Sequence, residues 1–349
     1  MKLDDLLALA IEGGASDLHL NPGRPPLLRV NGSLQELDAP PLDDNSAAQL
    51  AKELCRESEW NEVQSVGTAD FGIAHSSGNR FRVSVLKQRG RISAVLRLIP
   101  GQLLSLDAIG LPDSVRELLT RTRGLVLVTG PTGSGKTTTL AAMVEWINAN
   151  LDRHIVTIED PIEYFHEHKR GVVTQREIGA DVPDFPEAIR RALRQDPDVI
   201  LVGEMRDLET IAAAITAAET GHLVFGTLHT TGSATTVNRI IDAFPANQQE
   251  QIRSQLSVSI QAVVSQVLLP RVSGGGRVAA FEVMLMTPAI GNLIRKNETA
   301  KIPSTIQTSR RQGMMALDDQ LLELLRNGEI SKENALSAAQ DPGELEARL

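Results

Sequence analysis

The chain has 349 residues, of which 42% are apolar and 23% charged, and its formal net charge is −9 at pH 7. This length fits about two globular domains with real cores. The negative charge and the 3% aromatic content argue against a direct nucleic-acid partner. No window approaches the ~18 uninterrupted apolar residues of a membrane span. The single cysteine, Cys55, excludes an internal disulfide and a cysteine-cluster zinc site. We therefore expect a cytoplasmic protein without a transmembrane segment.

Residues 1–99 mix helical and strand patterns and predict a small α+β domain. We expect a helix, then strands with a turn at Asn31-Gly32, then a second helix capped by Asn45 or Ser46. Two runs that alternate polar and apolar residues follow, joined by a turn at Gly90, as in a half-buried hairpin. The expected ranges are 3–12, 16–37, 46–62, 79–87 and 91–99.

The pattern changes after a linker that we place at residues 100–112. Short apolar runs then alternate with helix-length segments, which predicts a parallel sheet covered by helices on both faces. The expected strands are 125–128, 154–158, 199–202 and 223–228. We assign residues 113–349 to an α/β nucleotide-binding domain that ends in helices from about residue 247 onward.

A phosphate-binding loop follows the first of these strands. The segment Gly130-Pro131-Thr132-Gly133-Ser134-Gly135-Lys136-Thr137 fits G-x-x-x-x-G-K-[ST] at every position, and a helical run begins at Thr138. This strand, loop and helix are the context in which the motif binds phosphate. We expect the loop and Thr138 to bind ATP. Lys136 would contact the β- and γ-phosphates, and the Thr137 hydroxyl would ligate Mg²⁺.

Acidic side chains follow two other strands. Such an enzyme needs a carboxylate near the metal and one that orients the attacking water, and strand ends are where these groups lie in α/β sheets. Glu204 follows strand 199–202 as a Walker B acid would, and Glu163 belongs to a second acidic cluster. Glu159 and Asp160 are candidates for the surroundings of the metal. Asp207 is expected to cap the helix 208–219.

Two histidines and three arginines are further candidates. His222 and His229 bracket strand 223–228, and a histidine at a strand end can sense the γ-phosphate, although a histidine taken alone is more often a structural residue. Arg80, Arg82 and Arg97 lie on the predicted hairpin. Their pattern alone favours a solvated strand face, whereas in a ring they would reach a neighbouring subunit's phosphates.

Four segments together resemble one family. They match the Walker A, Asp box, Walker B and His box of the type II/type IV secretion ATPase superfamily, and are most similar to the PilT family of twitching-motility retraction ATPases. The opening 15–20 and the segment 274–280 also match. The four segments are 130–137, 158–164, 196–207 and 220–231.

The resemblance implies a homohexameric ring whose subunits pair a PAS-like N-terminal domain with a RecA-like ATPase core. It assigns catalytic roles to Glu163, Glu204, His222 and His229, and it places arginine fingers in the segment of Arg80, Arg82 and Arg97. The cofactors would be ATP and Mg²⁺. The partners would be the pilus machinery and an inner-membrane platform protein, and the location would be peripheral, at the inner-membrane pilus base. The implied function is pilus retraction by pilin disassembly.

Three other functions remain open from the sequence. A pilus assembly or type II secretion ATPase shares these motifs, although such proteins commonly carry an extra N-terminal domain and a four-cysteine zinc module. A hexameric DNA translocase would share the core but conflicts with the charge. A non-catalytic regulator, either an accessory paralogue of the motor or an ATP-binding interaction module, would share the fold, but the intact catalytic motifs disfavour it.

The C-terminal region departs from the family pattern. Retraction motors usually carry Ala-Ile-Arg-x-x-Ile-Arg-Glu, whereas this chain has the segment 289–296 with Gly291 and Lys296 in place of the first Arg and the Glu. Arg295 remains. We expect a helix with Ile290, Leu293 and Ile294 on its packed face, and a role in coupling the ring to its work.

Overall fold

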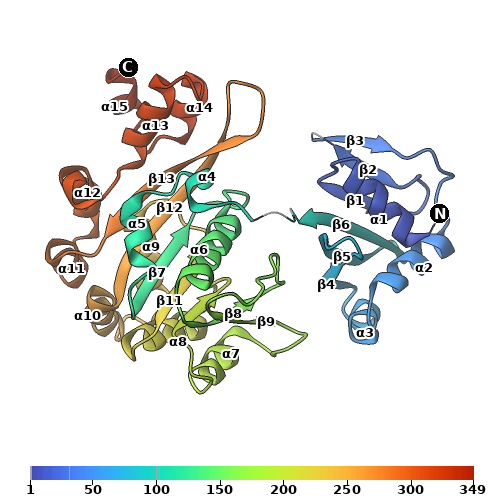
Figure 1. Cartoon of the computed structure of the whole chain (residues 1–349), viewed down its shortest axis with the longest axis horizontal. Coiled ribbons are helices and arrows are strands. Elements are labelled where there is room, and N and C mark those ends of the chain that lie inside the picture. The colour runs from blue at the N-terminus through green and yellow to red at the C-terminus, as the bar shows by residue number, and fades with distance from the viewer. Residues whose placement is uncertain (1, 31, 100, 102) are drawn as a thin grey trace. The chain divides into compact units, whose positions relative to one another are not determined.

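A computed structural model describes residues 2–30, 32–99, 101 and 103–349 (Figure 1). The chain forms two compact units. The first comprises Met1–Leu103 together with Asp160–Phe165, and the second comprises Leu104–Glu159 and His166–Leu349. The interval 100–112, predicted as a linker, contains helix α4 (Leu106–Ile109), whose first turn is capped by the Ser105 side chain. Of the predicted linker, Pro100 and Gln102 lie outside the described residues.

The first unit is built on a six-stranded antiparallel sheet with the order β3-β2-β1-β6-β5-β4. Alternation along β5 explains the two faces, because Phe81 and Val83 are buried in the core while Arg82 between them is exposed. Helices α1 and α2 contribute apolar side chains to the same core. The elements are α1 (Leu3–Glu12), β1 (Asp17–Leu20), β2 (Leu27–Val30), β3 (Ser33–Glu36), α2 (Asp44–Leu54), α3 (Glu57–Ser65), β4 (Thr68–Ala74), β5 (Arg80–Gln88) and β6 (Arg91–Ile99).

The predicted helix 3–12 and the hairpin are confirmed, but the helix expected at 46–62 was wrong. It is two helices, because the backbone at Cys55 is extended and interrupts the helical hydrogen bonds. Its cap is Asp43, which accepts a hydrogen bond from the backbone N–H of Ser46 at 2.7 Å, so neither predicted cap residue was right. Asn31 of the predicted turn lies outside the described residues.

The second unit contains a seven-stranded sheet with the order β13-β12-β7-β11-β10-β8-β9. Strands β12, β7, β11, β10, β8 and β9 are parallel, and β13 pairs antiparallel with β12. The predicted parallel sheet is confirmed. The strands are β7 (Gly124–Thr129), β8 (His154–Glu159), β9 (Val172–Glu177), β10 (Val199–Val202), β11 (Leu223–Leu228), β12 (Ile260–Pro270) and β13 (Arg277–Leu285).

Helices cover both faces of this sheet, as its buried strands require. Apolar residues of α4, α5 and α6 pack on one face, and those of α7 to α12 pack on the other. Besides α4, the α-helices of the second unit are α5 (Asp113–Leu118), α6 (Lys136–Asn150), α7 (Phe185–Ala192), α8 (Leu208–Glu219), α9 (Ser233–Asp242), α10 (Gln249–Ser259), α11 (Pro288–Arg295), α12 (Ile302–Thr308), α13 (Leu317–Arg326), α14 (Lys332–Ala338) and α15 (Pro342–Ala347).

The expectation of helices from about residue 247 onward is confirmed at α10 and from α11 onward, but it was wrong for residues 260–285. Strands β12 and β13 extend the sheet beside β7, joined by a turn that contains Gly274-Gly275-Gly276. The apolar run of β12 has no periodicity that separates a buried strand from a buried helix. The segment is a strand because it pairs with β7 on one side and β13 on the other.

Candidate nucleotide-binding site

The phosphate loop lies between β7 and α6, where its glycines are required by the backbone. Gly130, Gly133 and Gly135 have φ angles of 143°, 79° and 88°, which other residues rarely adopt. A Cβ at Gly130 would also lie 2.2 Å from the backbone oxygen of Gln266. Gly135 is the N-cap of α6 and provides no side-chain cap, so the first-turn N–H groups remain available to an anion.

The ammonium group of the loop lysine donates hydrogen bonds to carbonyl oxygens of the loop. Lys136 Nζ donates to the carbonyl oxygens of Gly130 at 2.8 Å and Pro131 at 3.1 Å. Burial lowers the pKa of Lys136, while the nearby Glu204 carboxylate opposes that shift. Ser134 Oγ is buried and has no hydrogen-bond partner among the described residues. A half-buried cation, an unused hydroxyl and open helix N–H groups fit the phosphates of a nucleotide.

Glu204 follows β10 and pairs with groups from the neighbouring strand end. Its Oε1 lies 2.9 Å from His229 Nε2 and 2.5 Å from Arg206 Nε. Burial alone raises the pKa of Glu204, but Arg206 and His229 outweigh it and the pKa is lowered. The carboxylate is therefore charged at neutral pH and can accept a hydrogen bond from water.

His229 connects this carboxylate to the phosphate loop. Its Nδ1 lies 3.4 Å from Thr132 Oγ1, and its Nε2 faces Glu204. A pocket of about 510 Å³ opens beside these groups. Its lining residues are Glu204, Met205, Arg206, Leu228, His229, Thr230 and Arg239. Three of the residues singled out in the sequence, Lys136, Glu204 and His229, therefore gather at the carboxyl ends of adjacent parallel strands.

His222 does not join that group within the subunit. It precedes β11, at the opposite end of the strand from His229, and its backbone carbonyl accepts from the N–H of Gly124 at the start of β7. Its Nδ1 lies 3.0 Å from the carbonyl of Ala217 in α8. These contacts are those of a helix-to-strand connection.

Gln266 of β12 is a contributor that the sequence reasoning missed. Its Nε2 donates to the carbonyl of Ser134 at 2.7 Å, and its Oε1 accepts from Thr139 Oγ1 of α6 at 2.7 Å. The residue is buried. A polar pair, Ser265-Gln266, inside an otherwise apolar run was the available signal.

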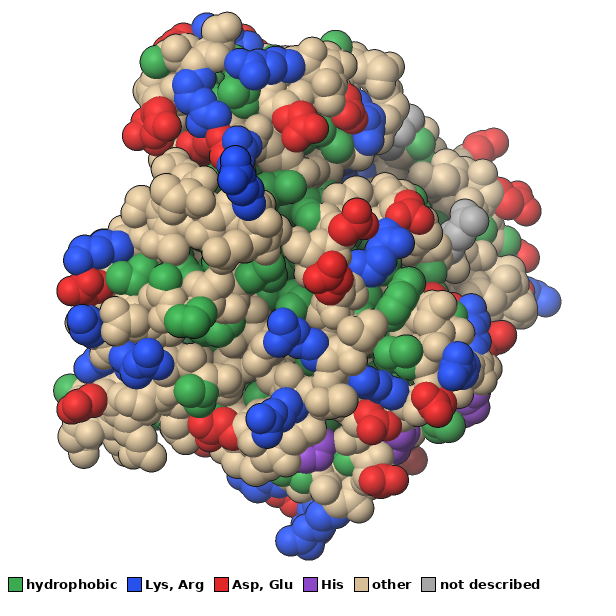
Figure 2. All heavy atoms as spheres, turned by 60° about the vertical axis from the view of Figure 1, so that its left-hand side comes forward, with side chains coloured by type: hydrophobic (Ala, Val, Ile, Leu, Met, Phe, Trp, Pro, Cys, Tyr) green, Lys and Arg blue, Asp and Glu red, His purple; other side chains and the backbone are tan. Residues whose placement is uncertain are grey.

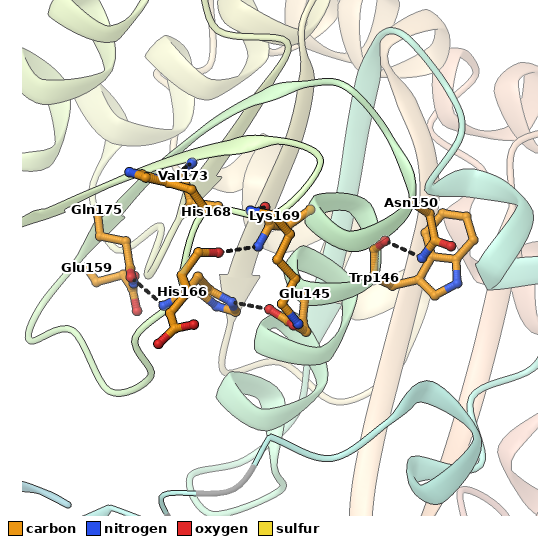
Figure 3. A network of polar contacts seen from close by, with 11 residues as sticks. Glu145, Trp146, Asn150, Glu159, His166, His168, Lys169, Val173 and Gln175 are labelled. Atoms are coloured by element: carbon orange, nitrogen blue, oxygen red, sulfur yellow. Dashed lines mark hydrogen bonds and ion pairs between the residues drawn. The ribbon is translucent and has the colours of Figure 1, made fainter. Parts of the chain in front are cut away.

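Glu159 ends β8 within a network of polar contacts (Figure 3). Its Oε1 accepts from Thr157 Oγ1 at 2.6 Å and from Gln175 Nε2 at 3.3 Å. Gln175 Oε1 accepts from the backbone N–H of His166, whose ring lies 3.1 Å from Glu145 of α6. Glu159 and His166, which flank the segment 160–165, are therefore each held by hydrogen bonds within the second unit.

The segment 160–165, which includes Asp160 and Glu163, itself counts with the first unit. The guanidinium of Arg80 lies 3.8 Å from the centre of the Phe165 ring, a cation–π contact. The predicted boundary had assigned these residues to the ATPase domain. Asp160 and Glu163 thus belong to the same unit as Arg80, whereas Glu159 belongs to the second unit.

The other two candidate arginines are cross-strand neighbours. Arg82 of β5 pairs in register with Arg97 of β6, and Arg97 is opposite Asp17 of β1. Arg97 Nε lies 2.9 Å from Asp17 Oδ1, yet 69% of the Arg97 side chain is exposed. Burial raises the pKa of Asp17, but Arg97 and Ser16 lower it overall. Both arginines therefore lie on the polar face of the first sheet.

These features define a P-loop nucleotide-binding α/β protein: a buried strand, a glycine loop that leads into α6 at Gly135, and a lysine beside a charged carboxylate. A family profile described as "Type II/IV secretion system protein" matches residues 2–337. The chain belongs to this family.

Relatives and a solved structure agree with this assignment. The chain is 48% identical over 342 residues to the "Type IV pilus retractation ATPase PilT" of Pseudomonas aeruginosa, covering 98% of this chain and 99% of that protein. It is 46% identical to a "Twitching motility protein" of Neisseria gonorrhoeae, covering 90% and 84%. The crystal structure of the pilus retraction motor PilT with bound ADP superposes with a TM-score of 0.92 at 47% identity, covering 99% of each chain. The predicted fold class, an N-terminal domain with an ATPase core, is confirmed.

None of the helices in the described part of the chain has the length and hydropathy needed to cross a bilayer.

Proposed function

We propose that this protein is a motor that hydrolyses ATP to drive type IV pilus retraction, with pilin disassembly as its mechanical output. The observation that carries the proposal is the near-full-length match to retraction ATPases, in a chain whose phosphate loop, Glu204 and His229 are assembled in one place. The family relation supports the motor task, and the site supports the chemistry.

The site residues suit ATP with Mg²⁺. The lysine ammonium of Lys136 would hold the β- and γ-phosphates, and the Thr137 hydroxyl would ligate the metal together with Glu204, directly or through water. When bound there, Mg²⁺ would supply positive charge against the phosphate oxygens. Glu204 would accept a hydrogen bond from the attacking water, and His229 would fix the orientation of that carboxylate. Glu159 and Asp160 would hold the surroundings of the metal.

We further propose that the active form is a homohexamer in which Glu163, Arg80, Arg82 and Arg97 complete the site. The exposure of Arg97, and its position beside Arg82 on one sheet face, support a role at a neighbouring subunit. His222, being remote from His229 along the strand, would act at a boundary between subunits.

We also propose that the ring works in the cytoplasm, peripherally at the inner-membrane base of the pilus and against a platform protein. We propose no direct nucleic-acid partner. On the face drawn in Figure 2, Lys and Arg side chains are interspersed with Asp and Glu, and a continuous basic stripe is absent from the described residues visible there.

The test is Mg²⁺-dependent ATP turnover by the purified protein, with Lys136→Ala as the key variant. Loss of the ammonium removes the charge that holds the β- and γ-phosphates, so turnover should vanish. Lys332→Ala is the matched control, because that lysine is exposed and forms an ion pair with the exposed Glu346. Near-wild-type turnover in Lys136→Ala would refute the site. In cells, deletion of the gene should leave labelled pili that extend and fail to retract.

A further inference from the structure

A buried carboxylate contacts Ser233, four residues after His229. Glu282 of β13 is 2% exposed. Its Oε1 accepts from both the backbone N–H and the hydroxyl of Ser233, each at 2.6 Å, and its Oε2 accepts from Gln340 Nε2 at 2.6 Å. A buried carboxylate is costly unless it is well hydrogen-bonded, and charge-assisted hydrogen bonds of this kind are strong. The short contacts show that both oxygens are engaged.

Glu282 supplies the cap that α9 lacks in its own sequence. The N-cap of α9 is Gly232, which has no side chain, and Ser233 begins the helix. A negative charge at this end also suits the helix dipole. The N–H of Gly232 donates to Ser265 Oγ at 2.9 Å, and Thr236 Oγ1 donates to the Gly232 carbonyl at 2.8 Å. The start of α9 is thereby fixed to β12 and β13.

The fixed start of α9 determines where the preceding segment runs. Only Thr230, Thr231 and Gly232 separate His229 from Ser233. At its other end the segment is held by the contacts of His229 with Glu204 and Thr132. A shift at Ser233 would therefore move the imidazole relative to the carboxylate that it orients.

The second oxygen of Glu282 connects this segment to the C-terminal helices. Gln340, which follows α14, donates to Glu282 through its side chain and to Asp318 Oδ1 through its backbone N–H at 2.8 Å. The N–H of Asp341 donates to the other oxygen of Asp318 at 2.9 Å, and Asp318 lies in the first turn of α13. An unbroken set of hydrogen bonds thus runs from α13 to the start of α9.

We propose that Glu282 is a positioning residue that holds the His229 imidazole in place relative to the Glu204 carboxylate. Gln340 connects Glu282 to the C-terminal helices. The inference rests on the proposed ATPase function. Glu282 lies outside the phosphate loop, so it acts on turnover and leaves nucleotide binding largely intact.

The experiment compares Glu282→Leu with Glu282→Gln in the full-length protein. Leucine removes both acceptors, whereas glutamine keeps one and donates to Gln340 after that amide rotates. We expect Glu282→Leu to lower kcat about tenfold or more with the KM for ATP changed less than about threefold, and Glu282→Gln to restore most of the rate. Gln320→Leu is the control, because Gln320 accepts from the N–H of Phe281 on the same strand and does not contact the His229 segment.

A double-mutant cycle with His229→Ala tests the route of the effect. If Glu282 acts through His229, adding Glu282→Leu to His229→Ala leaves kcat where the single His229→Ala variant has it. Multiplied losses, or a Gln320→Leu variant that loses as much turnover, overturn the proposal. Should Glu282→Leu fail to fold, Gln340→Ala replaces it in the same cycle, with a smaller expected loss.

The cycle also separates this inference from the proposed function. If wild-type protein hydrolyses no ATP, the proposed function fails. If it does hydrolyse ATP and His229→Ala keeps wild-type turnover while Glu282→Leu loses it, the ATPase assignment stands and the positioning role is overturned.

Discussion

Replacing Gln266 by leucine should weaken both the fold and nucleotide binding. The side chain is buried, and its amide joins the carbonyl of Ser134 to the hydroxyl of Thr139 at 2.7 Å each. Leucine has a similar volume but offers neither partner a hydrogen bond. A buried polar group left unsatisfied costs about 1–3 kcal/mol, so the two groups together cost about 2–6 kcal/mol.

Part of this cost should appear as weaker ATP binding. Ser134 lies within the phosphate loop. Without the Gln266 amide, the loop would shift so that the Ser134 carbonyl finds another donor, and nucleotide binding would have to reverse that shift. If reversing the shift costs about 1.4 kcal/mol, ATP binding is weakened tenfold. Urea unfolding would measure the first effect, and titration with a fluorescent ATP analogue the second. Gln251→Leu, on the exposed face of α10, is the control. If Gln266→Leu matches wild type in both assays, the loop does not depend on this amide.

Other predictions concern the reacting groups. Glu204→Gln should lose turnover far more than ATP affinity, because its charge acts on the attacking water, and we expect Glu163→Ala to behave alike. Equal losses of affinity and rate would indicate a binding or folding role instead. Mixing Arg97→Ala subunits with Lys136→Ala subunits should partly restore turnover if Arg97 acts on a neighbour. Mixed rings that form but stay inactive would contradict that role.

The parts of the site that follow local rules were predictable from sequence. The phosphate loop is defined by backbone angles that only glycine adopts readily, and those glycines stand at fixed spacing. Asp207 caps α8 as expected, accepting from the N–H of Thr210 at 2.8 Å. Glu204 and His229 were found because parallel strands bring their carboxyl ends to one edge.

The parts that depend on contacts between distant segments were not predictable. Gln266 reaches Ser134 only because β12 joins the sheet beside β7, and the apolar run of β12 does not reveal that it is a strand. The contact between Arg80 and Phe165 likewise joins two distant segments, because the hairpin precedes the phosphate loop in the sequence and the acidic segment follows it. Neither pairing leaves a periodic signal.

Helix α11 shows how the departure from the family's C-terminal pattern is accommodated. The expected packed face is confirmed, since Ile290 and Ile294 are fully buried and Leu293 is partly buried against the same core. Glycine inside a helix costs about 1 kcal/mol relative to alanine. At Gly291, however, a Cβ would lie 3.1 Å from the carbonyl of Ser257 in α10, which is tighter than ordinary contact. The glycine therefore permits close packing of α11 on α10.

Arg295 contacts the same residue of α10, Ser257, and this arrangement predicts a role in coupling. Its Nη1 donates to Ser257 Oγ at 3.0 Å, so the remaining arginine of the motif joins α11 to α10 and does not contact the phosphate loop. Arg295→Ala should therefore keep most ATP turnover while retraction of labelled pili in cells stops. Ser257→Ala removes the hydrogen bond but keeps the arginine, and retraction in that variant would show that the charge of Arg295, rather than its anchoring, transmits the work. Unchanged retraction in Arg295→Ala, or equal loss of turnover and retraction, would contradict a separate coupling role, because a residue that only supports the ATPase core lowers both together.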